Sequence, residues 1–504
     1  MCESFAVPGK KSSLNARKFL NLGRSKLKKL KYFEALENLN KSLCYAEEGS
    51  KEMIEAYANR SEVYFMIKEY EKCLENINLA IKCGCDASVN EVLKLREAKC
   101  NELLKDDNSQ VFNPWSFFKL SYPPHEKLPY VANCIELKQH ELFGRYLVTT
   151  RNLTPGDIIA IEEPFFKIVH TSSTHLRCSN CLKANKLDLI PSRLTSSGMF
   201  CSEQCQTMAT GNFHNVEVDL RSIEFAQKIL LESLNICDQN VDKLKALIED
   251  PKQSSQTVFD FDWSDKENGK FKMHGLLAFN SLQLGPITDD LDYIETHPVL
   301  DYFEYEHDRE IAKAYLIRIA RILSVNCYSL DWWSPKREDD DNLLFSSNKM
   351  KIGSAMLPFG SLFNHSCAPS IDRMIVDNKF VFIVRRSVCK GEQLFISYGP
   401  SFIREPNDFR QMNLKAHFDF SCSCEACVAN FPIAFSHPLS REVLTIKDGP
   451  ITSNDEWKWK EELKKNYQAI EGNHTKFPSL SLWKIMDRNL YLLAAIARNE
   501  PFVF

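Results

Sequence analysis

Four cysteines late in the chain constrain its fold more than any other feature. One of them, Cys367, ends the string Asn-His-Ser-Cys, and the other three follow about 55 residues later as the CxCxxC motif of Cys422, Cys424 and Cys427. Four thiolates spaced in this way suit a tetrahedral zinc ion, because the short spacings let three sulfurs converge while the fourth arrives from another element. A metal at this position would clamp the late segment onto the Asn-His pair.

A second group of cysteines, Cys178, Cys181, Cys201 and Cys205, forms a CxxC half and a CxxxC half about twenty residues apart. Each half closes a small chelate ring at low entropic cost, so the two halves together predict a second zinc site. Four ordinary buried thiols are the alternative, which this regular spacing disfavours. Sulfur tetrahedra favour zinc over iron, which stays the other metal to consider.

The overall composition excludes some classes of protein. At 504 residues the chain is long enough for about three or four compact units, and a formal net charge of -4 with 26% charged residues predicts neither a nucleic-acid nor a membrane partner. The first residues contain no apolar signal region, and no uninterrupted apolar run is long enough to span a bilayer. The chain has 18 cysteines. We therefore expect a soluble protein in a reducing compartment, cytoplasmic or nuclear, where grouped cysteines indicate metal rather than disulfides.

Residues 14 to about 105 contain an internal repeat with a period of 38 residues. Small residues at matching positions let two helices approach closely, while tyrosine and leucine fill the groove between helical hairpins. The segment therefore resembles tetratricopeptide repeats, with a partial third unit near residues 92–100. The basic run from Arg17 to Lys31 is interpreted as a solvated helix face, with a partner-binding or nuclear-import surface as the alternative. The matching pairs are Gly23 and Ser61, Tyr32 and Tyr70, Ala35 and Cys73, Leu39 and Ile77, and Ser42 and Ala80.

The rest of the chain alternates between strand-rich and helical segments. Residues 144–148 and 158–163 predict two strands joined by a turn, and residues 374–384 predict a hairpin. Residues 391–399 predict a further strand that carries Tyr398 near its end. The pattern is helical again after Cys427. It is also helical from about 205 to 330, where one helix has an apolar face formed by Ile311, Tyr315, Ile319 and Leu323.

Taken in order, these motifs resemble the SET-and-MYND lysine methyltransferase family, in its tetratricopeptide-bearing branch. The resemblance rests on the helical repeats, a strand-rich domain interrupted by a cysteine cluster, Asn-His-Ser-Cys, Gly-Glu-Gln-Leu followed by Tyr398, and CxCxxC. It covers the chain from about residue 14 to 430. It implies an α+β multidomain fold, in which a SET β-fold is split by a MYND-type zinc module and a helical insert.

The same resemblance implies the domain boundaries. They are tetratricopeptide-like helical repeats at 1–110, the first part of the SET domain at 111–177, a degenerate MYND zinc module at 178–218, a helical SET insert at 219–330, the SET core at 331–400, a cysteine-rich post-SET zinc segment at 401–430 and a short C-terminal helical region at 431–504.

The residues that match the family's motifs imply a site for S-adenosylmethionine. The cofactor-binding residues would be Gly144, Arg145, Asn326, Ser361, Asn364, His365, Tyr398 and Phe418, and the eight grouped cysteines would hold two zinc ions. Tyr398 matches the tyrosine at the methyl-transfer centre and is the expected catalytic residue. For His365 a role in the cofactor pocket is favoured, with general-base catalysis as the alternative.

The sequence also departs from the family pattern. A full MYND module holds two zinc ions, and the alignment puts Ser192, Thr195 and Val218 at ligand positions of the second ion, where only His214 remains. We therefore predict one zinc ion in this module and two in the chain, with residues 191–198 held by packing. Tyr146, Ser370 and Phe418 stand where many relatives have a glycine, an asparagine and a second active-site tyrosine.

The leading hypothesis is methyl transfer from S-adenosylmethionine to a lysine of a histone or non-histone protein. A free lysine has a pKa near 10.4, so a narrow aromatic channel must favour the uncharged amine. The alternative is a weak or inactive zinc-stapled scaffold that acts in protein-protein interaction or transcriptional regulation. A lysine-bearing protein substrate, a protein partner on the N-terminal helices and a monomeric state are the remaining expectations.

Overall fold

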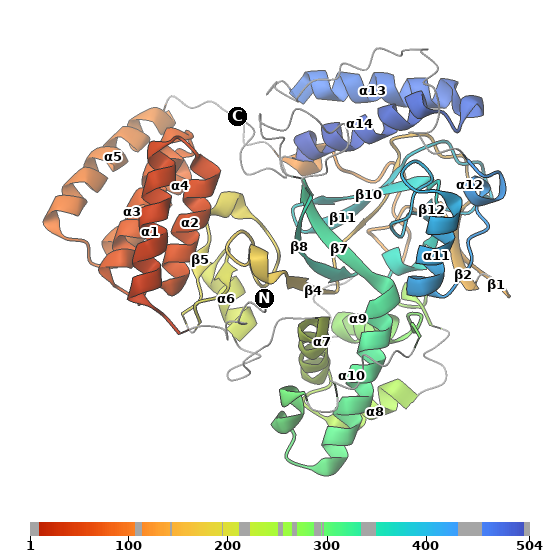
Figure 1. The fold of residues 1–504 in the computed structure, drawn as a ribbon, viewed down its shortest axis with the longest axis horizontal. Helices are drawn as coiled ribbons and strands as arrows, with labels where there is room; N and C mark the ends of the chain where they lie inside the picture. Colours follow the sequence, from red (N-terminus) through yellow and green to blue (C-terminus); the bar gives the residue numbers. More distant parts are fainter. Residues whose placement is uncertain are drawn as a thin grey trace.

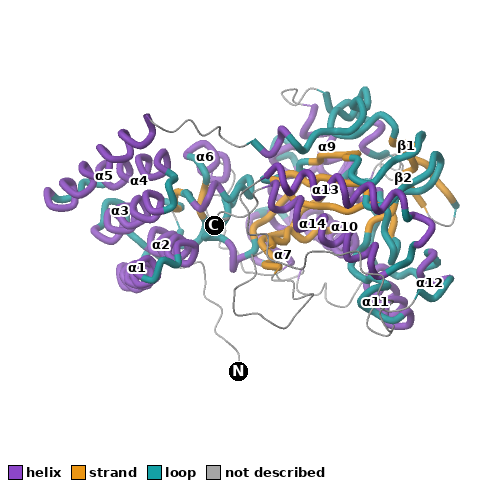
Figure 2. The backbone as a smooth tube through the Cα atoms, turned by 90° about the horizontal axis from the view of Figure 1, so that it is seen from above, coloured by secondary structure: helices purple, strands orange, loops and turns teal. Residues whose placement is uncertain are grey.

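The computed structural model describes residues 10–105, 113–141, 144–193, 195–210, 222–249, 256–264, 270–286, 294, 297–333, 349–431 and 456–497. Helical and strand-rich parts alternate along the chain. The N-terminal helices lie at one end of an elongated molecule, and the sheets with their covering helices lie at the other (Figures 1 and 2). The cysteine module, which carries Cys178, Cys181, Cys201 and Cys205, contains β5, β6 and α6. It lies between these two parts (Figure 1).

The N-terminal part consists of helical hairpins, as the 38-residue period predicts. Gly23 permits the close approach within the first hairpin, because a Cβ atom at this position would lie 2.8 Å from Cγ of Leu39. The matching pair Leu39 and Ile77 is fully buried, which confirms that the repeated positions form the core. The helices are α1 (Ser13–Lys28), α2 (Tyr32–Tyr45), α3 (Lys51–Met66), α4 (Tyr70–Lys82) and α5 (Ala87–Lys105).

The strands of the described residues form small sheets rather than one continuous sheet. The strand orders are β1–β2, β10–β11–β3, β4–β8–β7 and β5–β6, all with antiparallel neighbours, and β9–β12, which is parallel. The bounds are β1 (Ile135–His140), β2 (Gly144–Thr149), β3 (Ile158–Glu162), β4 (Phe166–Val169), β5 (Ile190–Pro191), β6 (Met199–Phe200), β7 (Cys327–Trp333), β8 (Lys349–Met356), β9 (Asn364–His365), β10 (Ile371–Val376), β11 (Lys379–Val384) and β12 (Phe395–Ile396).

The structure confirms most of the predicted strands and changes one. The predicted hairpin is β10–β11, and β2 and β3 match the predicted pair of strands, although they pair with β1 and β11 instead of with each other. The strand expected at 391–399 is only the two-residue β12, because the chain leaves the strand conformation on both sides of it. Gly391 and Gly399 have positive φ angles of 86° and 142°, and Leu394 donates its N–H to Leu147 of β2.

A helical insert lies beside the sheets, at the bottom of Figure 1. The predicted apolar face of its longest helix is confirmed, since Ile311, Tyr315, Ile319 and Leu323 are all buried. Tyr315, Ile319 and Leu323 pack in one core with Phe166 of β4, so the insert is joined to the sheets by apolar contact. Its helices are α7 (Ser222–Ile236), α8 (Val241–Glu249), α9 (Lys270–Asn280) and α10 (Glu306–Asn326), and α6 (Glu203–Thr210) precedes them in the cysteine module.

Two C-terminal helices cover the β10–β11–β3 sheet (Figure 1). Trp459 and Leu492 pack against Val381 and Ile383 of β11, which buries the outer face of that sheet. These helices are α13 (Glu456–Gly472) and α14 (Leu480–Ala497), and the segment before them contains α11 (Asn407–Phe418) and α12 (Glu425–Val428). Within the described parts of the chain, no helix is both long and apolar enough to cross a bilayer.

Candidate active site and metal centres

The sulfur atoms of Cys367, Cys422, Cys424 and Cys427 converge on one point. All four Sγ atoms lie within 4.8 Å of one another, and those of Cys367 and Cys427 are 3.6 Å apart. A tetrahedral zinc ion with zinc–sulfur bonds of about 2.3 Å would separate its sulfurs by about 3.8 Å. The cluster therefore has the dimensions of a metal site, and it joins the loop after β9 to the start of α12.

The second cysteine group converges in the same way. The Sγ atoms of Cys178, Cys181, Cys201 and Cys205 lie within 4.8 Å of one another, with 3.5 Å between Cys181 and Cys201. These two groups are the candidate metal clusters among the residues that the structure describes.

Ser192 and Thr195 stand at positions aligned with ligands of the second zinc ion of a full MYND module. In this chain their side chains are hydrogen-bonded to each other. Oγ1 of Thr195 is 3.3 Å from Oγ of Ser192, and the Ser192 N–H donates to the Gly198 carbonyl. This pairing closes the loop between β5 and β6 with protein groups. His214 and Val218 lie outside the described residues. The prediction of a single zinc ion in this module therefore keeps its support from Ser192 and Thr195.

A buried arginine accompanies the late cysteine cluster. Arg410 of α11 is fully buried, and its guanidinium lies 3.6 Å from Sγ of Cys427. Gln411 makes two hydrogen bonds to the Cys422 peptide, at 2.7 Å and 2.9 Å. The positive charge of Arg410 offsets part of the thiolate charge, and Gln411 fixes the backbone of the CxCxxC motif.

His365 connects this cluster to Tyr398. Its Nε2 lies 3.3 Å from Sγ of Cys367, and its Nδ1 accepts the Tyr398 N–H at 3.0 Å. Burial lowers the pKa of His365 to about 4, so the imidazole is neutral. Because both ring nitrogens already have partners, the geometry favours a positioning role in the pocket over the general-base alternative.

Tyr398 lies in a cluster of aromatic rings. Its ring centroid is 4.9 Å from that of Phe418 and 6.4 Å from that of Phe420, and its hydroxyl donates to the Phe363 carbonyl at 2.7 Å. Asp419 takes a left-handed conformation, with φ 57°, at the end of α11. This turn brings Phe420 back toward Tyr398.

Phe420 was not among the residues predicted from the sequence. Its signal was the Phe-Asp-Phe spacing just before Cys422.

An open cavity adjoins these rings. Its volume is about 480 Å³, which is within the usual range for a small-molecule site. The wall combines the rings of Tyr398 and Phe418 with polar side chains of α10 and α11. The complete lining is Ser324, Tyr398, Gly399, Pro400, Glu405, Asn413, His417 and Phe418.

Arg145 and Asn326 hold one segment between them. Arg145 donates to the Ser281 carbonyl at 2.7 Å, and Asn326 donates to the Gln283 carbonyl at 2.8 Å. Both residues were predicted to bind the cofactor, and both are anchored to this segment after α9. The structure thus brings Tyr398, His365 and Phe418 into direct contact, whereas Arg145 and Asn326 come from a separate hydrogen-bonded group.

Gly144 offers open space and Ser361 an unsatisfied polar group, while Asn364 is positioned by its strand. Gly144 has a φ of 66°, and a Cβ atom there would meet no other atom within 4 Å. The buried hydroxyl of Ser361 has no hydrogen-bond partner among the described residues. Asn364 lies in β9, whose neighbour β12 leads into Tyr398. An open glycine and an unsatisfied buried hydroxyl fit a bound polar cofactor.

Glu162 anchors the segment that precedes Asn364, although the sequence alone did not single it out. Its carboxyl oxygens accept the N–H groups of Phe359 and Gly360, both at 2.8 Å, and Tyr328 donates its hydroxyl to the Gly360 carbonyl. A Cβ atom at Gly360 would lie 3.0 Å from Phe382 and 3.0 Å from Leu357, so this peptide is held on every side. Because Ser361 directly follows Gly360, these contacts also fix the position of Ser361.

Glu162 also predicts a pH dependence of stability. Burial raises the pKa of Glu162 to about 8, against the opposite effect of the two N–H groups. Between the unfolded pKa of about 4.3 and the folded pKa, the folded chain keeps a proton that the unfolded chain has lost, so this contribution to stability falls as pH rises.

We expect the free energy of unfolding of the wild type, relative to Glu162→Gln, to fall by about 2 kcal/mol between pH 6 and pH 8. Chemical denaturation of both proteins at the two pH values measures it. A difference that stays constant or grows with pH would contradict the raised pKa.

Comparisons with known proteins agree with this geometry. A model of the SET domain family matches residues 144–399. The chain is 22% identical to protein-lysine N-methyltransferase SMYD4 of Danio rerio, over 84% of this chain and 66% of the relative. It is 20% identical to SMYD4 of Homo sapiens, over 80% and 66%, and 24% identical to a SET and MYND domain-containing protein of Dictyostelium discoideum, over 58% and 82%. The chain thus spans slightly less than two thirds of the SMYD4 relatives.

Proposed function

We propose that this chain, which belongs to the SET domain family, transfers a methyl group from S-adenosylmethionine to a lysine side chain of a protein. The observation that carries the proposal is the cavity beside Tyr398, which is walled by aromatic rings and connected through His365 to a candidate metal cluster. The relatives named SMYD4 are protein-lysine methyltransferases, which supports the same reaction.

Of the residues proposed to hold S-adenosylmethionine, Tyr398 and Phe418 line this cavity and His365 contacts Tyr398. The cofactor supplies an electrophilic methyl group on a sulfonium. We propose that the open Gly144, the unsatisfied Ser361 hydroxyl and the Asn364–His365 strand receive its polar groups, with Arg145, Asn326 and Phe418 completing the pocket. The two cysteine clusters fit zinc, whose proposed role is structural because each supplies four sulfur ligands.

Tyr398 has the geometry to orient an incoming amine. Its hydroxyl hydrogen is directed at the Phe363 carbonyl, so the lone pairs of its oxygen are available to accept a hydrogen bond from a lysine N–H. Burial raises the pKa of Tyr398 above its usual value, which keeps the hydroxyl protonated. Alignment of the nucleophile is a large part of such catalysis.

Phe418 and Phe420 contribute by excluding water. Their rings lie 6.5 Å apart and flank Tyr398. An apolar wall favours the uncharged amine, because burial lowers the pKa of a lysine. Phe418 has no hydroxyl, so Tyr398 supplies the phenol at this wall. The alternative of an inactive scaffold is less favoured, because the catalytic tyrosine and its positioning contacts are present together.

Replacing Tyr398 with phenylalanine separates binding from transfer. We expect Tyr398→Phe to bind S-adenosylmethionine within about twofold of the wild type and to lower kcat roughly ten- to a hundredfold, because an oriented hydrogen bond is lost. Calorimetric titration of the zinc-loaded protein measures binding, and transfer of a labelled methyl group to proteins of a cell extract measures the reaction.

Leu323→Val, a conservative change in the helical insert core, is the control for general damage. A wild type that shows no saturable binding of S-adenosylmethionine would overturn the proposed function.

A further inference from the structure

The segment between the CxxC and CxxxC halves of the Cys178 group is held by side chains from the N-terminal part of the chain, most of them on the helices. Five of its main-chain carbonyl groups accept hydrogen bonds from residues that lie more than a hundred positions earlier in the chain. The donors and acceptors are Tyr64 to Lys186 at 3.0 Å, Asn40 to Leu187 at 3.0 Å, Arg60 to Leu189 at 2.7 Å, Lys11 to Ser192 at 2.7 Å and Cys44 to Gly198 at 3.8 Å.

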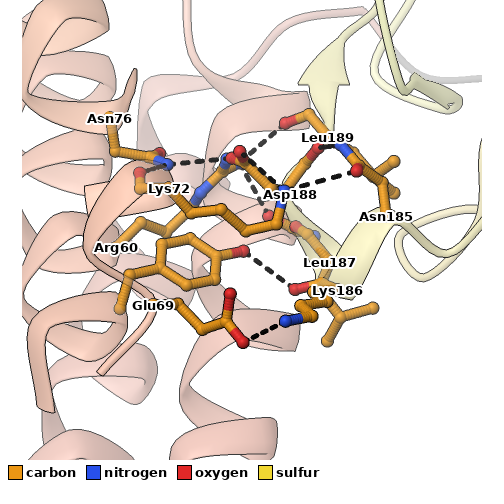
Figure 3. A network of polar contacts seen from close by, with 11 residues as sticks. Arg60, Glu69, Lys72, Asn76, Asn185, Lys186, Leu187, Asp188 and Leu189 are labelled. Atoms are coloured by element: carbon orange, nitrogen blue, oxygen red, sulfur yellow. Dashed lines mark hydrogen bonds and ion pairs between the residues drawn. The ribbon is translucent and has the colours of Figure 1, made fainter. Parts of the chain in front are cut away.

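This segment has an unusual backbone conformation. Asn185, Lys186 and Leu187 all have positive φ angles, of 47°, 52° and 63°. L-residues rarely adopt this region, so three in succession require support from their surroundings. Figure 3 shows that this support comes from the helices, whose side chains, among them Arg60, Lys72 and Asn76, point toward the turn.

A buried ion pair lies at the centre of the contact. Arg60 of α3 is fully buried and pairs with Asp188, whose side chain is 6% exposed. Asp188 also accepts a hydrogen bond from Asn76 at 2.8 Å and lies 3.7 Å from Nζ of Lys72 (Figure 3). Separating Arg60 from Asp188 would leave a buried charge without its partner, so the two surfaces are built to stay together.

We propose that the face formed by α2, α3 and α4 is the binding site for residues 185–193 and 195–198, and that docking on this face holds the Cys178 group in its metal-binding arrangement. Cys181 lies just before the docked segment, and Cys201 lies just after it. Fixing the segment shortens the free loop between the two cysteine pairs, which lowers the entropy lost on bringing their sulfurs together. The inference rests on the proposed metal assignment and is independent of methyl transfer.

The docking also limits where a separate partner can bind. The face that carries Asn40, Arg60 and Asn76 is covered by the chain's own segment, and all three side chains are buried. The N-terminal helices therefore serve the zinc module on one side. A protein partner would use their remaining surface.

Zinc release from the full chain tests the proposal. We expect Arg60→Met to release the zinc of the Cys178 cluster to a chromogenic chelator at least tenfold faster, with the zinc of the Cys367 cluster released at the wild-type rate. Tyr64→Phe removes one carbonyl contact without removing a charge, and we expect a smaller acceleration of the same phase. This milder variant keeps the test valid if Arg60→Met fails to fold.

Arg17→Met is the matched control. Arg17 pairs with Glu52 on the same helices, but its side chain is 67% exposed and makes none of the hydrogen bonds to the docked segment described above. We expect its release rates to equal those of the wild type. Wild-type rates in both Arg60→Met and Tyr64→Phe would overturn the proposal, as would equal acceleration of both phases. A wild type without zinc would overturn the metal assignment itself.

Discussion

Replacing Cys367 with alanine is expected to reduce the zinc content from about two ions to about one per chain and to weaken S-adenosylmethionine binding at least a hundredfold. The change removes one of four ligands from a site whose metal would contribute on the order of 10 kcal/mol to folding of the local structure. No contact of Cys367 with a substrate is needed for this effect.

The coupling runs through the two hydrogen-bonded contacts of His365. Sγ of Cys367 lies 3.3 Å from Nε2 of His365, and Nδ1 of His365 accepts the Tyr398 N–H. The Cys367 carbonyl also accepts the Phe402 N–H, so the cysteine fixes the chain that follows Tyr398. Losing the metal therefore releases the Asn364–His365 strand and the tyrosine at once.

Elemental analysis and calorimetric titration measure the two effects. Cys389→Ala is the control, because Cys389 is an exposed thiol outside both clusters, and we expect it to keep both zinc ions and full affinity. Loss of one zinc ion with unchanged affinity for S-adenosylmethionine would show that the cluster does not support the cofactor site.

The cysteine clusters were predictable because their chemistry is local. A CxxC or CxCxxC spacing limits the distance between thiols before any tertiary contact forms, and both groups converge as expected. The 38-residue period similarly predicted the helical hairpins, since each hairpin is stabilised by contacts between neighbouring segments. The expected strand around Tyr398 was too long, because its glycines turn the backbone at both ends.

The missed residues act through contacts that one sequence does not record. Glu162 reads as the first of two acidic residues at the end of an apolar strand, yet its carboxyl group accepts hydrogen bonds from a turn almost two hundred residues later. Arg60 and Asp188 are separated by 128 positions. Each looks like an ordinary surface charge in the sequence, yet both are buried in the folded chain. The residue type shows which side chains can carry a charge, but only the folded structure shows which of these charges are buried.

Arg385 joins the C-terminal helices to the sheet through a second buried charge network. Its guanidinium donates to Asp372 at 2.8 Å and to Asp487 of α14 at 3.0 Å, and it lies 3.9 Å from the ring centroid of Trp483. The Arg385 side chain is 3% exposed. Burial raises the pKa of Asp372, and Arg385 acts against this rise by stabilising the carboxylate.

Replacing Arg385 with methionine is expected to destabilise the protein by about 3 kcal/mol, because the partly buried carboxylates of Asp372 and Asp487 lose their shared cation. Without Arg385 the pKa of Asp372 rises further, so more of the destabilised protein takes up a proton as pH falls. We therefore expect the loss of stability to be smaller at pH 5 than at pH 8. Chemical denaturation followed by tryptophan fluorescence measures both.

Two further variants test whether the loss of stability comes from the unpaired carboxylates. Arg385→Met combined with Asp372→Asn should recover part of the stability and most of the pH difference, because one unpaired charge is removed. Arg404→Met, at an exposed arginine, should change the free energy of unfolding by less than about 0.5 kcal/mol. A loss below about 1 kcal/mol in Arg385→Met would mean that apolar contacts alone dock the C-terminal helices, since Trp459 and Leu492 would then suffice to hold them on β11.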